Sequence, residues 1–280
     1  MSDITDRSLL STPTVAIRDV TCRGSHRDQS AEEFTHSTHL VFPYRGVYVR
    51  HVGRDAAVAE ANQVLFFNRG EGYRVSHPLV GGDASLDVLV DEHVLRELVP
   101  ASRLVDGPSL AFRIQRLRID QRAQALVALL RHKLRHRTIE PLEADSLALT
   151  LVRRAVGPRT THAPAASPAR RRIVDRAKVV LARDLARRWT LAEVAAEVGH
   201  SPVYLTQLFQ QVEGLPLYRY QLRLRLAHAL QLLPHCDDLT SLGLELGFSS
   251  HSHFTTTFTR AFGRSPSAFR RAASRSERLQ

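Results

Sequence analysis

The last third of the chain contains the same unit twice, and this repeat constrains the fold more than any other feature of the sequence. The first copy runs from Leu191 to Pro216 and the second from Leu239 to Pro266. Each copy contains a short apolar segment, a glycine, a serine and a second apolar segment, and the two serines, Ser201 and Ser250, are 49 positions apart. This order predicts a helix-turn-helix module, whose second helix enters the major groove of DNA. Two copies predict two adjacent insertions into the groove.

Capping signals place the helix ends independently of the repeat. Thr190 and Glu193 have the spacing of a capping box. Ser201 followed by Pro202 is a cap with a proline in the first turn. Gly214 suits the left-handed residue just past a helix end. These signals predict a helix over Pro202–Glu213.

The segment between the two copies predicts one long helix. Pro216–Leu233 has no proline or glycine in its interior. The alternative is an ordinary small helical bundle over Leu191–Phe269 whose repetition is coincidental. Capping, charge and the small residues Ala195 and Gly243 at matching positions before each turn all favour DNA binding instead.

Positive charge is concentrated in the region of the repeat. The chain of 280 residues carries 39 Lys and Arg against 28 Asp and Glu, a net charge of +11. Residues 1–156 contain 21 basic against 19 acidic residues, a net of +2, and residues 157–280 contain 18 against 9, a net of +9. Such a local excess is typical of a surface that binds a polyanion. An acidic membrane could use the same charge, but the sequence has no strongly amphipathic basic helix or second anchor signal. We therefore expect double-stranded DNA as a partner and no membrane.

The end of the repeat resembles the C-terminal signature of AraC/XylS-type transcription regulators. Gly247–Phe254 reads Gly-Phe-Ser-Ser-His-Ser-His-Phe, and Phe258–Pro266 reads Phe-Thr-Arg-Ala-Phe-Gly-Arg-Ser-Pro. The resemblance covers Arg170–Arg271. Gly243 stands where the family usually has Ala, and Arg264-Ser265 replaces a more usual apolar-Thr pair. The resemblance implies a sequence-specific DNA-binding transcription regulator of the activator type, and not an enzyme.

In the second helix of each module, the helical period distinguishes positions that face the core from positions that face outward. Leu205, Leu208 and Phe209 follow the spacing of a buried stripe, and Phe254 and Phe258 repeat it in the second copy. The outward positions match the base-reading positions of the family: Val203, Thr206, Gln207, Gln210, His251, Ser252, Thr255 and Thr256. A glutamine pairs with adenine, and Thr and Val methyl groups pack on the thymine methyl. For each single residue the alternative is a solvated polar position.

The affinity for DNA is expected to come from arginines that contact phosphates. The candidates lie in or around the two modules: Arg187, Arg188, Arg219, Arg223, Arg225, Arg260, Arg264, Arg270 and Arg271. Surface arginines often serve only solubility, and we expect about half of these to matter.

The N-terminal part predicts a different kind of domain. Short apolar or alternating runs between Phe34 and Val90 are separated by glycines such as Gly46 and Gly53, which is typical of a small β-barrel or jelly roll. His36-x-x-His39, Phe66-Phe67-Asn68 and the segment from Ser76 to Asp83 resemble the cupin-like sensory domain found in many members of the same family. The resemblance implies a small-molecule effector in this domain. The pocket candidates are aromatic residues and histidines: His36, His39, Tyr48, Phe67, Tyr73 and His77.

A metal site in this domain is the main alternative. Cupin enzymes bind iron or manganese through a His-x-His pair, whereas His36 and His39 are three positions apart and point to opposite faces of a regular strand. Tyr44 and Arg45 occupy the region where a glutamate ligand is expected. We therefore predict no metal and no cofactor. A cupin-type metalloenzyme fused to a DNA-targeting domain is the alternative function.

Two helices and a linker are expected between the two domains. Apolar stripes over Ile119–Leu134 and Leu142–Val156 predict an antiparallel helix pair that either covers the barrel or meets a partner chain, and the family resemblance favours a homodimer. Residues 157–170, rich in Pro, Ala, Thr and Ser, predict an exposed linker. The expected fold class is therefore α+β. A cupin-like barrel with a two-helix dimerisation segment spans residues 1–156, and an all-α domain of two modules joined by a linker helix spans residues 171–280.

The remaining features concern location and partners. Cys22 and Cys236 are the only cysteines, so a disulfide framework is not expected, and both are expected to be inert. The sequence has no signal-peptide pattern and no run of about 18 apolar residues. We expect a soluble cytoplasmic protein, with RNA polymerase as a possible further partner. The sequence does not identify the effector or the operator.

Overall fold

The computed structural model describes two compact units, Met1–Thr161 and His162–Gln280. It describes residues 4–24, 26–105, 107, 109–157 and 166–274. The boundary between the units falls within the expected linker 157–170, most of which lies outside the described residues. The last three residues of that expected linker are helical, because Ser167 caps a helix that begins at Pro168.

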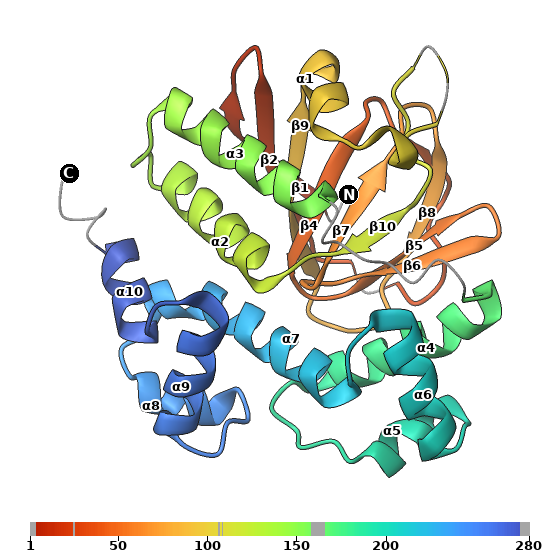
Figure 1. Cartoon of the computed structure of the whole chain (residues 1–280), viewed down its shortest axis with the longest axis vertical. Helices are drawn as coiled ribbons and strands as arrows, with labels where there is room; N and C mark the ends of the chain where they lie inside the picture. Colours follow the sequence, from red (N-terminus) through yellow and green to blue (C-terminus); the bar gives the residue numbers. More distant parts are fainter. Residues whose placement is uncertain (1–3, 25, 106, 108, 158–165, 275–280) are drawn as a thin grey trace. The chain divides into compact units, whose positions relative to one another are not determined.

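The N-terminal unit contains two antiparallel sheets (Figure 1). The larger sheet has six strands in the order β1-β2-β9-β4-β7-β10. The bounds of these strands are β1 (Ile4–Ser11), β2 (Val15–Cys22), β9 (Asp83–Val90), β4 (His39–Arg45), β7 (Gln63–Phe67) and β10 (Arg116–Arg118). The smaller sheet has the order β3-β8-β5-β6, with β3 (Glu33–Phe34), β8 (Gly72–Ser76), β5 (Tyr48–Val52) and β6 (Asp55–Ala59). Within the described residues the two sheets stay open and do not close into the expected barrel.

The strands of the larger sheet are apolar throughout because both faces of the sheet are covered. On β4, Leu40 and Phe42 belong to the core that the helices share, whereas Val41 belongs to a separate cluster with Tyr48 of the smaller sheet. The same alternation divides β7, where Phe66 joins the first core and Phe67 the second. Successive side chains of a strand point to opposite faces, so one strand contributes to two cores. This explains why the sequence shows apolar runs here rather than clear alternation.

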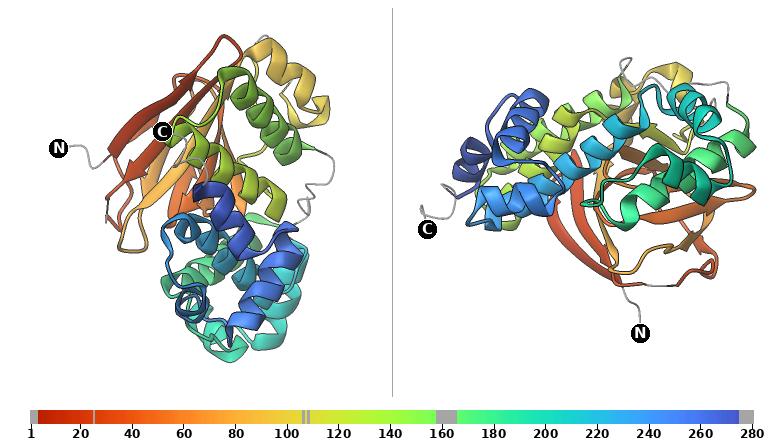
Figure 2. Two further views of the ribbon diagram at one scale, coloured as in Figure 1. Left: turned by 90° about the vertical axis from the view of Figure 1, so that its left-hand side faces the viewer. Right: turned by 90° about the horizontal axis from the view of Figure 1, so that it is seen from below.

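Three helices complete the N-terminal unit: α1 (Glu92–Leu98), α2 (Gln121–Arg135) and α3 (Pro141–Val156), with the short 3-10 helix η1 (Ala101–Arg103) after α1. The helices α2 and α3 lie side by side next to the larger sheet (Figures 1 and 2). Leu130 and Leu134 of α2 and Leu151 and Val152 of α3 are buried in the same core as Leu40. The apolar stripes of the two helices therefore cover the sheet of their own chain.

Helices make up the described part of the C-terminal unit. Their bounds are α4 (Pro168–Arg183), α5 (Leu191–Val198), α6 (Pro202–Glu213), α7 (Leu217–Leu232), η2 (Leu233–His235), α8 (Leu239–Glu245), α9 (His251–Phe262) and α10 (Pro266–Ser274). The two expected modules are α5-turn-α6 and α8-turn-α9, and α7 is the expected linking helix. The helix α4 packs against α5 and α6.

The ends of the module helices follow the local signals in the sequence. Thr190 and Glu193 form both hydrogen bonds of the capping box at the start of α5. Ser201 accepts a hydrogen bond from the Tyr204 amide at the start of α6, and Ser250 accepts one from the His253 amide at the start of α9. The turn residue Gly199 has a φ of 74°, in the left-handed region that favours glycine. The predicted bounds of α6 are confirmed.

The second module has a core of phenylalanine rings. Phe254 lies 5.1 Å from Phe248 and 5.7 Å from Phe258 between ring centroids. Gly243 of α8 faces this core, and a Cβ atom there would lie 3.1 Å from the Cβ of Phe254. The glycine therefore lets α8 approach α9 closely, at a cost in helix propensity of up to about 1 kcal/mol relative to Ala.

Arg225 of α7 connects the two modules. Its guanidinium is buried and donates hydrogen bonds to the carbonyl oxygens of Leu185 (2.6 Å), Ala186 (3.3 Å) and Arg187 (2.9 Å), which precede the first module, and of Gly247 (3.0 Å), in the turn of the second. Gly247 has a φ of 79°, and a Cβ there would lie 2.3 Å from the Ala186 carbonyl oxygen. The prediction that Arg225 contacts a DNA phosphate is therefore wrong, because every nitrogen of its guanidinium already has a backbone partner.

A buried ion pair fixes α4 against the end of α6. The Nζ atom of Lys178 lies 2.5 Å from Oε1 of Glu213 and 3.4 Å from Oδ1 of Asp175, and the Lys178 and Glu213 side chains are buried. The ammonium also lies 5.5 Å from the centroid of the Tyr220 ring. An ion pair of this kind costs desolvation, so removal of one partner leaves an unmatched charge in the interior.

We expect Arg225→Ala to lower the free energy of unfolding by roughly 2–4 kcal/mol, because four carbonyl oxygens lose a charged donor in a buried place. Chemical denaturation followed by circular dichroism measures this change. Arg219→Ala, which removes an exposed arginine from the same helix, is the control and should cost less than about 0.5 kcal/mol. An Arg225→Ala protein as stable as the control would contradict the structural role.

We expect Glu213→Leu to destabilise the protein by about 3–5 kcal/mol, because the Lys178 ammonium loses its main partner in the interior. The double variant Lys178→Met/Glu213→Leu should be more stable than Glu213→Leu alone, because no unmatched ammonium remains. Glu197→Gln, which breaks the exposed pair with Arg183, is the matched control and should cost less than about 1 kcal/mol. Equal denaturation midpoints for the single and double variants would rule out the unmatched Lys178 ammonium as the cause of the lower stability.

Candidate functional site

The outward face of α6 carries the four side chains that the sequence assigns to base reading. Thr206, Gln207 and Gln210 are exposed, and Val203 is 68% exposed although it is apolar. The opposite face is buried, with Leu205 and Phe209 in the domain core. The Thr206 hydroxyl donates to the Pro202 carbonyl oxygen at 2.9 Å and keeps its capacity to accept a hydrogen bond. The face can therefore offer amide, hydroxyl and methyl groups to a groove.

The corresponding face of α9 is more polar. His251, Ser252 and Thr256 are exposed, and Thr255 is half-buried with its Oγ1 atom 3.3 Å from Nε2 of His251. This contact couples two predicted base-reading side chains. His253, which the sequence analysis did not single out, has its Nδ1 atom 3.0 Å from Oγ of Ser249 and its ring 5.4 Å from that of Phe248. His253 thus supports the turn before α9.

The exposed tyrosine of α6 was also missed by sequence reasoning. The Tyr204 ring lies 5.1 Å from the ring of His200 in the turn of the first module, and 37% of Tyr204 is exposed. Both residues lie at the N-terminal end of α6, the end that contacts base edges in helix-turn-helix proteins. In the sequence, only the spacing of four positions between His200 and Tyr204 indicates this contact.

The predicted phosphate-contacting arginines fall into three groups. Arg225 is buried and structural, as described above. Arg187 and Arg270 have partners within the domain: Arg187 lies 2.7 Å from Oε1 of Glu193 and 4.0 Å from the Trp189 ring, and Arg270 donates to the Cys236 and Asp237 carbonyl oxygens. Five others are exposed and one, Arg223, is half-buried; the exposed ones are Arg188, Arg219, Arg260, Arg264 and Arg271.

Glu193 of the capping box also pairs with Arg187, and this pair affects the positive charge of the surface. Hydrogen bonds from the Thr190 amide and hydroxyl, and then from Arg187, lower the pKa of Glu193 to about 2. Glu193 therefore stays ionised and neutralises part of the charge of Arg187. The number of cations that can contact phosphates is therefore smaller than the excess of positive charge in this region indicates.

Between the two sheets of the N-terminal unit, four of the predicted pocket residues share one environment with Arg50. The ring of His39 stacks on Phe67 at 5.1 Å, and the edge of Tyr73 meets the same ring at 5.1 Å. Tyr48 is buried in the same apolar cluster as Phe67. The guanidinium of Arg50, which is fully buried, lies 3.8 Å above the centroid of the Phe67 ring. We call His39, Tyr48, Arg50, Phe67 and Tyr73 the inter-sheet cluster.

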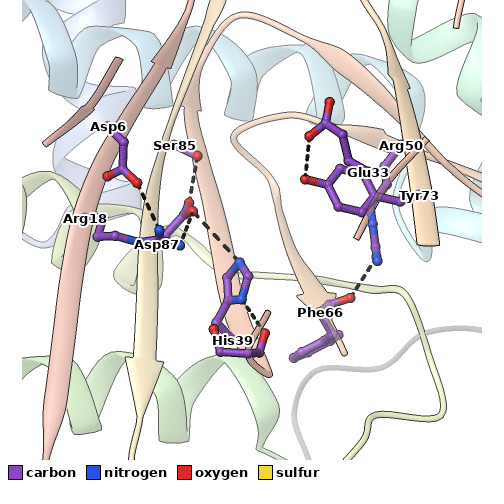
Figure 3. A network of polar contacts seen from close by, with 10 residues as sticks. Asp6, Arg18, Glu33, His39, Arg50, Phe66, Tyr73, Ser85 and Asp87 are labelled. Atoms are coloured by element: carbon purple, nitrogen blue, oxygen red, sulfur yellow. Dashed lines mark hydrogen bonds and ion pairs between the residues drawn. The ribbon is translucent and has the colours of Figure 1, made fainter. Parts of the chain in front are cut away.

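Polar contacts orient the inter-sheet cluster (Figure 3). Arg50 donates to the Phe66 carbonyl oxygen at 2.8 Å and forms an ion pair with Glu71, and Tyr73 donates to Oε2 of Glu33 at 2.9 Å. Nε2 of His39 lies 3.9 Å from Oδ2 of Asp87.

Burial sets the charge state of the pair His39 and Asp87. It lowers the pKa of His39 to about 4 and raises the pKa of Asp87 to about 6. His39 is therefore neutral near pH 7, and Arg50 is the fixed cation of the inter-sheet cluster.

Two predicted pocket residues do not belong to this cluster. His36 is exposed between β3 and β4. His77 lies after β8, where its Nε2 atom is 3.0 Å from Oδ2 of Asp83, and its ring centroid is 6.5 Å from that of Tyr48. The exposed His36 is therefore not part of the inter-sheet cluster, and His77 is more closely associated with Asp83 and Cys22.

The family comparison concerns the C-terminal unit. A family model described as "Helix-turn-helix domain" matches residues 194–272. The HTH-type transcriptional activator RhaR of Klebsiella pneumoniae is 34% identical over 125 residues, which are 44% of this chain and 43% of the relative. The HTH-type transcriptional regulator ExsA of Pseudomonas aeruginosa is 31% identical over 100 residues, which are 35% of this chain and 36% of the relative. The chain thus matches less than half the length of these relatives.

A solved structure is similar over part of the chain. The AraC-type transcriptional regulator from Chromobacterium violaceum is 28% identical, with a TM-score of 0.37, and the match covers 39% of this chain and 97% of that one. None of the helices in the described ranges is long and apolar enough to span a bilayer. The two modules lie in the part of the chain, residues 194–272, that matches the helix-turn-helix family model, and the relatives named above are helix-turn-helix transcription regulators.

Proposed function

We propose that the protein is a sequence-specific transcription regulator that inserts α6 and α9 into adjacent stretches of the major groove of double-stranded DNA. The observation that carries this proposal is the pair of exposed polar helix faces, each held by a capped helix-turn-helix module on one linking helix. Bases are read by Val203, Thr206, Gln207 and Gln210 from α6 and by His251, Ser252, Thr255 and Thr256 from α9.

In this proposal, contacts to bases and contacts to phosphates have separate roles. Gln207 is exposed in the middle of α6, and its amide matches the donor and acceptor pattern of adenine. The exposed arginines Arg260 and Arg264 lie on and just after α9 and would contact phosphates, which fixes the position of the domain without reading sequence.

Loss of a base contact and loss of a phosphate contact should produce different phenotypes. On an operator selected from random sequences with the unmodified protein, Gln207→Ala should lose about 1–3 kcal/mol and lose discrimination at one base pair. Arg260→Ala should weaken binding to all sequences and reduce the slope of log affinity against log salt by about 1. Fluorescence anisotropy at several salt concentrations measures both effects.

Matched controls come from the N-terminal unit. Arg153→Ala removes the same charge from an exposed position on α3, and Gln29→Ala shortens an exposed glutamine. Both should bind like the unmodified protein. If Gln207→Ala and Arg260→Ala also bound like the unmodified protein, the assignment of α6 and α9 to the groove would be wrong.

The N-terminal unit supplies the regulation in this proposal. A small molecule that binds the inter-sheet cluster would change DNA binding by preferring one arrangement of the regulator, since a ligand shifts an equilibrium only by its difference in affinity for the two states. The regulator would act as an activator, in keeping with the name of the RhaR relative. We further propose that it does so in the cytoplasm, as a homodimer that contacts RNA polymerase. We do not propose the metalloenzyme alternative, because its two histidines do not share one site: His36 is exposed, whereas His39 is buried between the sheets.

The chemistry of the inter-sheet cluster favours a small organic acid. A buried guanidinium between aromatic rings suits a carboxylate with an apolar body, which would compete with Glu71 for Arg50. We expect at least one compound in a panel of small aromatic and aliphatic acids to raise the Tm of the full chain. Its affinity should fall at least tenfold in Arg50→Met, which keeps a side chain of similar length without the charge.

The control for this experiment is Arg54→Met, at the exposed turn between β5 and β6. It should bind the same compound as the unmodified protein does. A panel without any stabilising acid, or one whose active compounds bind Arg50→Met unchanged, would reject Arg50 as the recognition group.

A further inference from the structure

Three possible metal ligands from distant parts of the sequence meet at one end of the two N-terminal sheets. Cys22 is the last residue of β2, Asp83 is the first residue of β9, and the two are paired across these neighbouring strands of the larger sheet. His77 directly follows β8 of the smaller sheet. The cluster of Cys22, His77 and Asp83 therefore lies where the larger and the smaller sheet come together.

The donor atoms are spaced for a common ion. One donor atom from each residue lies within 4.8 Å of the other two. In a tetrahedral zinc site, bond lengths of about 2.0–2.3 Å place neighbouring donor atoms about 3.3–3.7 Å apart. Nε2 of His77 and Oδ2 of Asp83 are already 3.0 Å apart. Side-chain rotations that widen this contact and shorten the longer ones would place all three donor atoms around one ion.

The contact between His77 and Asp83 is close but is not a well-aligned hydrogen bond. Oδ2 of Asp83 is buried and accepts no hydrogen bond, although Nε2 of His77 is 3.0 Å away.

The surrounding backbone is shaped around the sulfur and the imidazole. The Gly24 amide lies 3.2 Å from Sγ of Cys22 and donates to it, which stabilises a thiolate. A Cβ atom on Gly24 would lie 3.0 Å from the His77 ring and 3.1 Å from Sγ of Cys22. Glycine at this position therefore lets the chain pass directly over both ligands. Arg45 interacts electrostatically with Asp83, but its side chain is exposed, so that solvent screens its repulsion of an ion.

We propose that Cys22, His77 and Asp83 bind a zinc-class divalent metal ion that joins the two sheets of the N-terminal unit. Thiolate, imidazole and carboxylate together select Zn²⁺ over Mg²⁺ and Ca²⁺, which prefer sets of oxygen ligands. Three protein ligands leave a fourth position for water or for a small molecule. The ion stabilises the domain because the unfolded chain cannot assemble residues from β2, β8 and β9 at one point.

Cobalt provides a direct test in the full-length protein. After treatment with a chelator and with a thiol reductant, the chain should bind one equivalent of Co²⁺ with a thiolate-to-cobalt charge-transfer band in the near ultraviolet. Zn²⁺ should displace the cobalt and should raise the Tm. Cys22→Ser should abolish the charge-transfer band, and Cys22→Ser and Asp83→Asn should each lower the affinity for Zn²⁺ at least a hundredfold in competition with a chromophoric chelator.

Cys236→Ser is the matched control, because Cys236 lies in the C-terminal unit outside the cluster. It should keep the cobalt spectrum and the affinity of the unmodified protein. Far-ultraviolet circular dichroism of the metal-free variants checks that each one is folded, and the cobalt spectrum of the unmodified protein needs no variant.

A cobalt complex without a charge-transfer band, zinc affinity unchanged in Cys22→Ser, or equal loss in Cys236→Ser would each overturn the proposal. DNA binding by α6 and α9 is measured separately and does not depend on these outcomes.

Discussion

The arrangement of the two helix-turn-helix modules depends on one buried guanidinium. Arg225 donates to carbonyl oxygens on both sides of α7, from the segment Leu185–Arg187 and from the turn at Gly247. A guanidinium can do this because its donors are rigid, planar and always charged. The segment before the first module and the turn of the second are therefore hydrogen-bonded to the same residue of α7. The two copies of the repeat are therefore held together by these hydrogen bonds.

In the N-terminal unit, both faces of the larger sheet are buried. The helices α2 and α3 cover one face of the larger sheet, and the smaller sheet covers the other. This arrangement creates an interior in which a cation, Arg50, lies among aromatic rings and where His39 is held neutral by burial. It also brings strand ends of the two sheets together near His77. The inter-sheet cluster and the cluster of Cys22, His77 and Asp83 are consequences of the same layered packing.

The arginines illustrate why charge alone is an incomplete guide to a nucleic-acid surface. The same residue type serves as a buried backbone clamp at position 225, as an ion-pair partner of Glu193 at position 187, and as an exposed cation at position 260. The composition of the region predicts a polyanion as partner, and it overstates the number of available charges. Only the three-dimensional structure separates an arginine that binds its own chain from one that faces outward, because the difference lies in burial and not in residue type.

The sequence by itself determined the two modules, with the ends of α5, α6 and α9, because caps and left-handed glycines act within a few residues of one another. It also determined that the N-terminal part is rich in short strands and is followed by two helices. The tertiary structure alone decided that the strands form two open sheets, that β1 and β2 extend the larger one, and that Arg225 points inward. It alone placed Cys22 opposite Asp83, which lies 61 positions later in the chain. Strand pairing and burial depend on contacts between distant segments, and no local pattern of residues records which distant segment a strand will meet.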